Sequence, residues 1–182
     1  EDRLVVSEGN WPILGTGVYS PVGSPYVSPG PRHGDPSVSE DDYADFMIRY
    51  LLIALCSGLV EQVCWWRLAA YGYGLVDESD PDQWRERPAF RMLKTFLDWV
   101  GEATFVERLA LNESDAVAFC FQREDRPRFW IAYTPGEACD VAFPEQVEGV
   151  WDAFGNPMAT APGGATVRLS GRPVYLKSSL IG

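Results

Sequence analysis

The chain of 182 residues carries a net charge of −11 at pH 7, and 46% of its residues are hydrophobic. This length accommodates one ordinary domain or two small ones with a normal hydrophobic core. The acidic balance, with basic residues scattered along the chain, is expected to repel nucleic-acid backbones. The longest apolar stretch, residues 50–56, is too short to cross a membrane.

The first half of the chain has the pattern strand, helix, strand. A β-branched strand over residues 4–8 ends on a carboxylate, Glu8, and a second strand over residues 60–68 ends on aromatic residues. Ser39 is a good N-cap for the helix between them, and Gly58 is expected at the C′ position of that helix. In a parallel β/α architecture, the carboxyl ends of such strands meet at the edge where substrates bind. A carboxylate at this edge, with tryptophan on the next strand, is typical of a site that cleaves sugars.

The segment between the first strand and the helix, residues 10–39, is dense in proline, glycine and serine. It is either a flexible linker or a long loop over an active site, and Trp11, Tyr19 and Tyr26 favour the loop because disordered linkers usually lack aromatics. On this interpretation His33 either lines the cleft or is exposed without a role. A third hypothesis is a proline-rich ligand for an SH3-type groove.

The second half of the chain begins with a helix over residues 88–100, which Gly101 ends, and continues as short strands separated by glycine and proline. These features indicate an α/β region followed by an all-β region, an antiparallel β-sandwich, with the boundary near Ala103. We therefore expect one domain over residues 1–103 and a second over residues 104–182. The predicted strands of the sandwich are residues 105–111, 116–122, 129–133, 141–143, 150–154, 166–169 and 174–176.

Four stretches of the sequence resemble the retaining glycoside hydrolases with (β/α)8 barrels, the clan that includes β-xylosidases, cellulases and β-galactosidases. Val6–Pro12 is similar to the seventh barrel strand, which carries the nucleophile, and Trp65–Leu68 with the loop after it is similar to the eighth. Val150–Asn156 and Arg172–Leu176 are similar to the small β-sandwich that follows the barrel in many members. A complete barrel needs roughly 250 residues. The resemblance therefore implies the last quarter of a barrel and its trailing sandwich, as a C-terminal fragment of a longer enzyme.

The resemblance makes Glu8 the catalytic nucleophile. Retaining hydrolysis needs two carboxyl groups roughly 5–5.5 Å apart, one nucleophilic and one acting as acid and then base. In the family the second group lies at the end of the fourth strand, which this chain lacks, so the chain alone is expected to be inactive. The alternative is that Glu8 only faces solvent. Four other carboxylates are poor substitutes because of their positions: Glu40, Glu61, Asp77 and Glu78.

The aromatic end of the second strand supplies the expected substrate contacts. Trp65 and Trp66 should point to opposite faces because side chains alternate along a strand, so that one is a sugar platform and the other packs on a helix. Family precedent favours Trp65 as the platform. Arg67 shares the predicted face of Trp65 and either contacts a sugar or forms a structural ion pair. Trp11 is a further candidate for substrate binding.

No metal or other cofactor is expected. The four cysteines form no CxxC pair, and the chain has a single histidine. Apparently unpaired cysteines favour a reducing, cytoplasmic compartment. The expected partners are a carbohydrate substrate and either the remainder of the barrel or a second copy of the chain. The alternative function is a non-catalytic carbohydrate-binding or assembly module.

A tight turn is predicted between two strands of the sandwich. Gly155 should supply a positive φ, and Pro157 should hold Asn156 extended. Asp152 is expected to cap backbone amides of this turn, and a sugar-binding role is the alternative.

Overall fold

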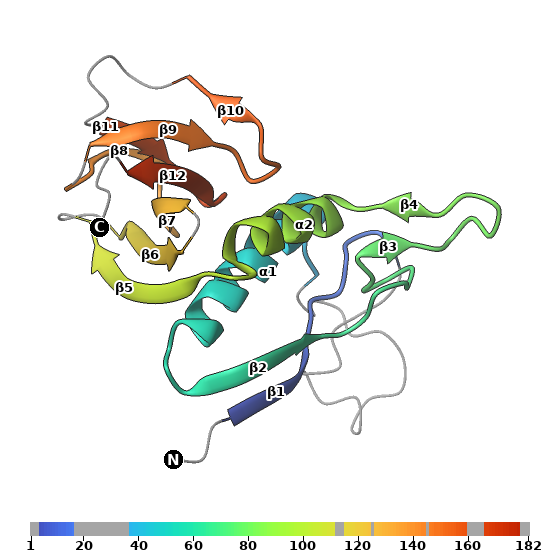
Figure 1. The fold of residues 1–182 in the computed structure, drawn as a ribbon. Helices are drawn as coiled ribbons and strands as arrows, with labels where there is room; N and C mark the ends of the chain where they lie inside the picture. Colours follow the sequence, from blue (N-terminus) through green and yellow to red (C-terminus); the bar gives the residue numbers. More distant parts are fainter. Residues whose placement is uncertain are drawn as a thin grey trace. The chain divides into compact units, whose positions relative to one another are not determined.

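The structure is a computed structural model that is mostly β, with two helices and several sheets (Figure 1). It describes residues 4–16, 37–111, 115–124, 126–144, 146–159 and 166–178. The chain divides into two compact units, Glu1–Arg91 and Met92–Gly182. Most of the proline-rich segment, with His33, lies outside the described residues.

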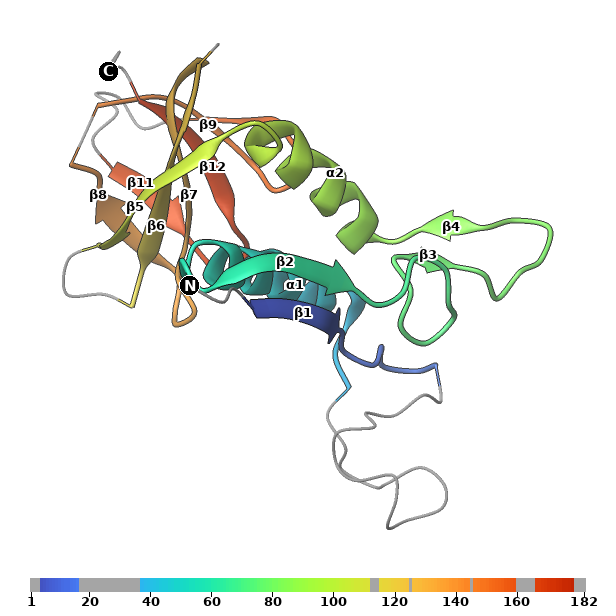
Figure 2. The same cartoon turned by 60° about the horizontal axis from the view of Figure 1, so that its bottom comes forward.

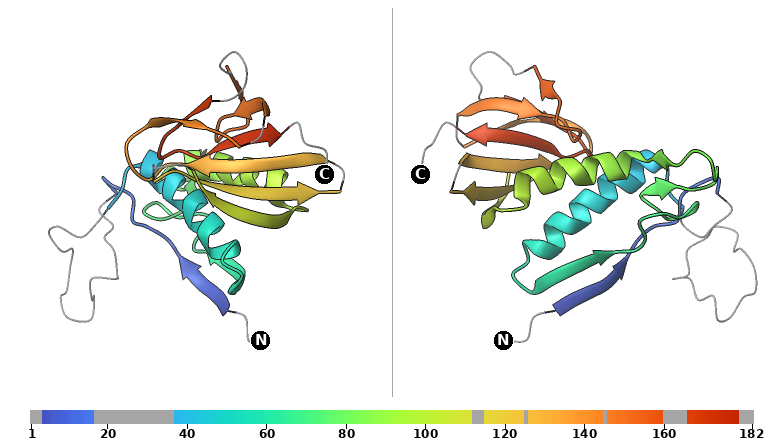
Figure 3. Two further views of the ribbon diagram at one scale, coloured as in Figure 1. Left: turned by 90° about the vertical axis from the view of Figure 1, so that its left-hand side faces the viewer. Right: turned by 45° about the vertical axis from the view of Figure 1, so that its right-hand side comes forward.

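The first unit contains a parallel pair of strands joined through a helix. Strand β1 (Leu4–Gly9) pairs with β2 (Val60–Trp65), and α1 (Glu40–Leu55) lies between them in sequence. Figure 3 shows α1 running along one face of this two-stranded sheet. A short antiparallel pair, β3 (Val76–Asp77) with β4 (Arg85–Glu86), follows β2 and was not predicted from the sequence.

Helix α1 begins as predicted and ends slightly differently. The Ser39 hydroxyl accepts a hydrogen bond from the backbone N–H of Asp42 at 3.0 Å, which satisfies one of the free amides of the first turn. At the other end Cys56 is the C-cap, because its N–H still bonds to the carbonyl of Leu52 at 3.0 Å. The C′ residue is therefore Ser57, and Gly58, predicted at C′, lies one residue further on, where its φ of +73° turns the chain toward β2.

The second unit is built on a six-stranded antiparallel sheet with the strand order β10-β9-β12-β7-β6-β5. Helix α2 (Pro88–Val100) begins in the first unit and continues into this one, with the bounds predicted from the sequence. A smaller antiparallel pair, β8 with β11, completes the unit (Figure 2). The strand bounds are β5 Thr104–Ala110, β6 Val117–Arg123, β7 Arg126–Tyr133, β8 Cys139–Ala142, β9 Val147–Trp151, β10 Pro157–Met158, β11 Thr166–Leu169 and β12 Val174–Ser178.

The central strands of the six-stranded sheet are buried on both faces. On one face Trp130 and Leu176 belong to a core cluster that also takes in Val141 of β8 and Leu169 of β11. On the other face Trp99 of α2 contacts aromatic rings of three strands, at centroid distances of 5.2 Å to Phe129, 5.4 Å to Trp151 and 5.1 Å to Tyr175. The central strands therefore carry apolar side chains in both directions.

The turn after β9 has the predicted construction. Gly155 has a φ of +84°. One carboxylate oxygen of Asp152 accepts hydrogen bonds from the backbone N–H groups of Phe154 and Asn156, both at 2.9 Å. The predicted capping role of Asp152 is confirmed.

Within the described residues, no helix is long and apolar enough to span a membrane. All four cysteines fall in this part of the chain, and none of them forms a disulfide.

Candidate active site

The carboxyl ends of β1 and β2 lie side by side, because the two strands are parallel. Gly9 is the register partner of Trp65, and the N–H of Trp66 donates to the carbonyl of Gly9 at 3.2 Å. Glu8 and Trp66 are therefore the residues that flank this last paired position. Both residues lie at the carboxyl edge of the sheet, which is where parallel β/α proteins bind their ligands.

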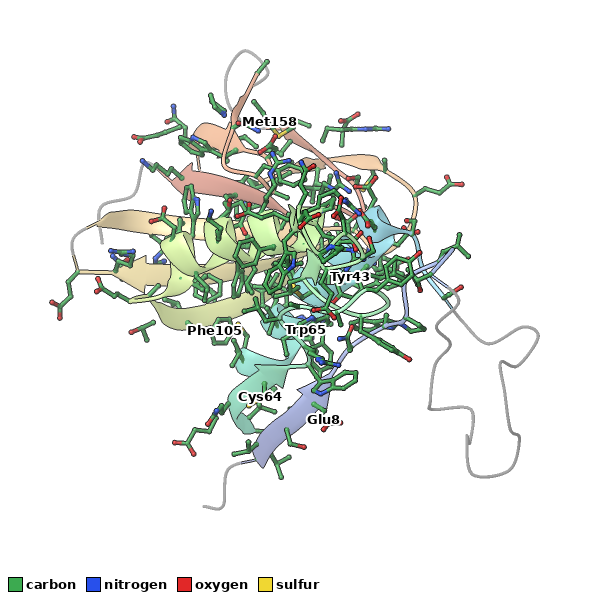
Figure 4. The ribbon with its side chains drawn as sticks, turned by 90° about the vertical axis from the view of Figure 1, so that its right-hand side faces the viewer. Glu8, Tyr43, Cys64, Trp65, Phe105 and Met158 are labelled. Atoms are coloured by element: carbon green, nitrogen blue, oxygen red, sulfur yellow. The ribbon has the colours of Figure 1, made fainter. Side chains whose placement is uncertain are left out.

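A register shift in β1 decides the face on which Glu8 lies. Between the paired residues Val6 and Gly9, β1 advances one residue more than β2. A Cβ atom at Gly9 would lie 3.2 Å from the ring of Tyr50, so Gly9 faces α1. Glu8 precedes Gly9 and points the other way, since neighbouring strand residues face opposite sides. Figure 4 shows Glu8 projecting from β1 away from Tyr43 and Trp65.

Trp65 lies on the side of α1. Its ring contacts Tyr43 and Tyr50 of α1 at centroid distances of 5.7 and 6.2 Å. Trp11 packs on the same side, 5.6 Å from Trp65 and 5.7 Å from Phe46. Trp65, the expected sugar platform, is therefore packed against α1, and Trp66 follows it directly beyond the end of β2.

Trp66 is 41% exposed. Its ring rests on Tyr73, with a centroid distance of 5.4 Å. The Arg67 guanidinium carbon lies 5.9 Å from the centroid of Trp66, and the peptide bond between these two residues is cis. The expectation that Arg67 shares the face of Trp65 assumed that the strand continues to residue 68. Because β2 ends at Trp65, that alternation does not extend to Arg67.

A hydrogen-bonded chain holds the loop after β2 against the sheet. The Trp65 indole N–H donates to the Tyr43 hydroxyl at 2.8 Å, and that hydroxyl donates to the Tyr73 carbonyl at 2.6 Å. The Asn10 side chain donates to the same carbonyl at 3.0 Å. Burial raises the pKa of Tyr43, so its hydroxyl keeps its proton as a donor. The backbone of Tyr73, whose ring supports Trp66, is thus held by the side chains of Asn10 and Tyr43, and Trp65 orients the Tyr43 hydroxyl.

A buried arginine organises the same loop from its other side. Arg87 is 1% exposed and donates to the carbonyls of Ala70 and Gly74 at 3.0 and 2.7 Å. It also pairs with Glu40 at 2.9 Å and with Asp77 at 3.3 Å. Asn10, Tyr43 and Arg87 were not identified as site residues from the sequence, because their partners are distant along the chain.

These contacts explain why two nearby carboxylates are poor proton donors. Hydrogen bonds from Arg85 and Arg87 outweigh burial and lower the pKa of Glu40. For Asp77, burial is outweighed by hydrogen bonds from Ser79 and Arg85, and its pKa is also lowered. A general acid needs the opposite shift. Glu61 lies near the amino end of β2, away from the edge that carries Glu8.

Among the described residues, no group of three or more histidine, cysteine, aspartate or glutamate side chains could hold a metal ion. The candidate site consists of the Glu8 carboxylate near the end of β1, and of Trp66 and Arg67 directly after β2.

Comparisons with known proteins give a likeness of fold. No protein-family profile and no curated protein matches the sequence. The chain is similar to a solved structure described as a family 39 glycoside hydrolase from the gut symbiont Bacteroides cellulosilyticus WH2, with a TM-score of 0.71 and 16% identity. The match covers 98% of this chain and 34% of the other, so this chain spans about a third of that protein's length and has the fold of a part of it.

Proposed function

We propose that the chain is the C-terminal part of a glycoside hydrolase that cleaves glycosidic bonds with retention. In this proposal residues 1–103 supply strands seven and eight of a (β/α)8 barrel with their helices, and residues 104–182 form the trailing β-sandwich. The observation that supports it is the position of Glu8 beside the last paired position of a parallel pair, with Trp66 directly after the partner strand. The likeness of nearly the whole chain to part of a glycoside hydrolase adds support.

Glu8 acts as the nucleophile in this reaction. Its carboxylate attacks the anomeric carbon of the sugar, the bond to the leaving-group oxygen breaks, and a glycosyl ester forms on Glu8. A general acid protonates the leaving group, and water later hydrolyses the ester with that residue acting as base. The general acid belongs to the part of the barrel outside this chain, so the chain alone is inactive.

Trp66 is the sugar platform on this assignment. Its exposed ring offers an apolar face for the C–H groups of a sugar, and Tyr73 supports it from below. The Arg67 guanidinium lies over this ring, 5.9 Å from its centroid, and in this proposal it donates to a hydroxyl or carboxylate of the substrate. Trp65 and Trp11 have a positioning role, because their rings hold the strand ends against α1.

The sheet of the first unit offers a surface for the missing strands. Leu4 and Val5 of β1 are 61% and 57% exposed. Within the described residues, the sheet that β1 and β2 form has just these two strands. Exposed apolar strand edges seek a partner. The remainder of the barrel fills this place in the complete enzyme, and a second copy of the chain fills it when the chain is isolated.

A mechanism-based trap tests the nucleophile directly. The complete enzyme is incubated with 2-fluoro glycosides, which form a slowly hydrolysed glycosyl ester, and the labelled peptide is sequenced. We expect the label on Glu8. Glu8→Gln should lower kcat by several orders of magnitude and abolish labelling, because the amide is no nucleophile.

Glu61→Gln is the matched control, since Glu61 is an exposed carboxylate near the other end of the neighbouring strand. It should label and turn over like the unaltered enzyme. Labelling of another residue, or near-normal activity of Glu8→Gln, would refute the assignment. Glycan binding without turnover in the complete protein would favour the alternative, a non-catalytic binding module.

A further inference from the structure

A pocket of about 540 Å³ lies within the second unit, apart from the strand ends that carry Glu8. Its wall on α2 consists of Lys94, Thr95, Asp98 and Trp99, and its other walls come from β9, the turn after β9, and β12. Its volume falls within the range of pockets that hold small ligands, roughly 300–1,000 Å³. The remaining lining residues are Trp151, Phe154, Gly155 and Lys177.

The lysines of this pocket are unusual within the chain. Of its 15 basic residues only two are lysine, and they are Lys94 and Lys177. They lie far apart in the sequence, on a helix and on a strand, and both line this one pocket. With Asp98 as the carboxylate of the lining, the pocket carries a local positive balance in a chain whose net charge is −11. Such a site attracts an anion that the rest of the molecule repels.

The indole of Trp151 is held in place as one wall of the pocket. A Cβ atom at Gly149 would lie 2.6 Å from the Trp151 ring, so the ring lies close over the bare backbone of Gly149. Lys177 is the register partner of Gly149, and its ammonium lies 5.1 Å from the centroid of Trp151. The missing side chain at Gly149 therefore lets an aromatic ring and a cation come together at the pocket.

The lining suits a ligand with an apolar face, hydroxyl groups and a negative charge. Indole rings bind the C–H faces of sugars, and the Asp98 carboxylate can accept from sugar hydroxyls. Two ammonium groups can each donate to a carboxylate. A sugar residue that carries a carboxylate combines these three properties, whereas a neutral sugar offers the lysines no carboxylate and a simple anion offers the aromatic wall no apolar face.

We propose that this pocket of the second unit binds an acidic sugar residue, a uronate, through Lys94, Lys177 and the ring of Trp151. The site is independent of catalysis at Glu8. It would hold an acidic polysaccharide or its side chain beside the sandwich.

The pair of lysines provides the test. Reductive methylation with ¹³C-formaldehyde labels both lysines and the terminal amine, and the few resulting NMR signals are followed as ligand is added to the full chain. The probes are a galacturonate trimer, the matched galactose trimer and inorganic phosphate. We expect the galacturonate trimer to shift both lysine signals with saturation, and the other two probes to give little change at equal concentration.

Two variants locate the binding. Lys177→Gln should weaken galacturonate binding by about tenfold or more, because a charge-assisted contact is lost. Gly149→Ala keeps both lysines but displaces the Trp151 ring, and it should also weaken binding. Arg168→Gln is the control, since Arg168 is an exposed cation of the same unit that pairs with Asp140 and does not line the pocket.

Each alternative outcome overturns the proposal. Equal binding of the galactose trimer removes the role of the carboxylate, and equal binding of phosphate shows a simple anion site. Unchanged affinity in Gly149→Ala, with circular dichroism confirming the fold, removes the aromatic platform. Absence of any shift with galacturonate removes the site. None of these results bears on Glu8, so the proposed catalytic function is tested separately.

Discussion

The two units of this molecule differ in how the faces of their β-sheets are covered. The second unit buries both faces of one antiparallel sheet, with β8 and β11 on one side and Trp99 on the other. The first unit has a parallel pair covered by α1 on one face, and its loops are fixed by the buried charge of Arg87. Parallel strands are normally covered on both faces. Within the described residues α1 covers one face of the parallel pair and Leu4 and Val5 of β1 are exposed, whereas the central strands of the second unit are covered on both faces.

The largest expected effect tests the role of Arg87. Arg87→Met removes donors from buried carbonyls and the partner of two carboxylates, so it should lower the free energy of unfolding by about 3–5 kcal/mol. Arg85→Met is the matched control. Arg85 contacts the same carboxylates, but its side chain is 53% exposed, and its loss should cost about 0–1 kcal/mol. Urea unfolding measures the loss of unfolding free energy in both variants. Equal losses would show that the stability of the first unit does not depend on the buried position of Arg87.

A pair of identical substitutions compares the two sheets. Leu176→Ala creates a cavity in the second unit, where Leu176 is fully buried, and should cost about 2–5 kcal/mol. Leu4→Ala on β1, where the leucine is 61% exposed, should change stability by no more than about 0.5 kcal/mol. Thermal melts of the isolated chain, diluted until sedimentation shows a monomer, measure both. A large loss for Leu4→Ala in the monomer would show that the chain itself already covers this part of β1.

Local chemistry made much of this fold predictable. The start of α1 follows from the Ser39 cap, and the bounds of α2 follow from its apolar periodicity and Gly101. The turn at Asp152 and Gly155 was predicted because its hydrogen bonds join residues at most four apart. In each case, the residues that determine the local structure lie within a few positions of it in the sequence.

The parts that could not be predicted depend on distant partners or on an irregular strand. Nothing near Arg87 in sequence indicates that it is buried, because its hydrogen-bond and ion-pair partners come from α1 and from the loop after β2. Regular alternation predicted Trp65 and Trp66 on opposite faces, but it gave no way to choose which of them packs on α1. The choice depends on the register shift before Gly9 and on the rings of α1.

A smaller effect is expected in the turn after β9, the best-predicted feature of the second unit. Gly155→Val should cost about 1–3 kcal/mol, because a β-branched residue resists the observed φ of +84°. A Cβ atom there would meet Thr95 only at ordinary contact distance, 3.6 Å, so the cost comes from the backbone and not from a clash. Gly155→Asn should therefore cost less, since asparagine tolerates this conformation. Equal melting temperatures of the valine variant and the unaltered chain would contradict the assignment.

The smallest effect concerns the pH dependence of the same turn. Burial opposes ionisation of Asp152, but hydrogen bonds from Asn156 and Phe154 outweigh it and lower the pKa of this carboxyl. A lowered pKa in the folded state means that Asp152 contributes stability above the unfolded value of about 3.9, and that this contribution is lost as the pH falls through the folded value. The melting temperature of Asp152→Ala should thus lie below that of the unaltered chain at pH 7, and the difference should shrink below about pH 3.9.

Asp140→Ala is the control for this measurement, because Asp140 is 61% exposed and makes a surface ion pair with Arg168. Its melting temperature should stay close to that of the unaltered chain at neutral pH, since such pairs contribute little. A difference for Asp152→Ala that is constant across the acidic range would show that the ionised form is not what the turn binds. If Asp152→Ala melts like the unaltered chain but no longer binds glycans, Asp152 belongs to a sugar site and not to the structure of the turn. The hydrogen bonds to Phe154 and Asn156 favour the first outcome, because they already use the carboxylate oxygens to close the turn.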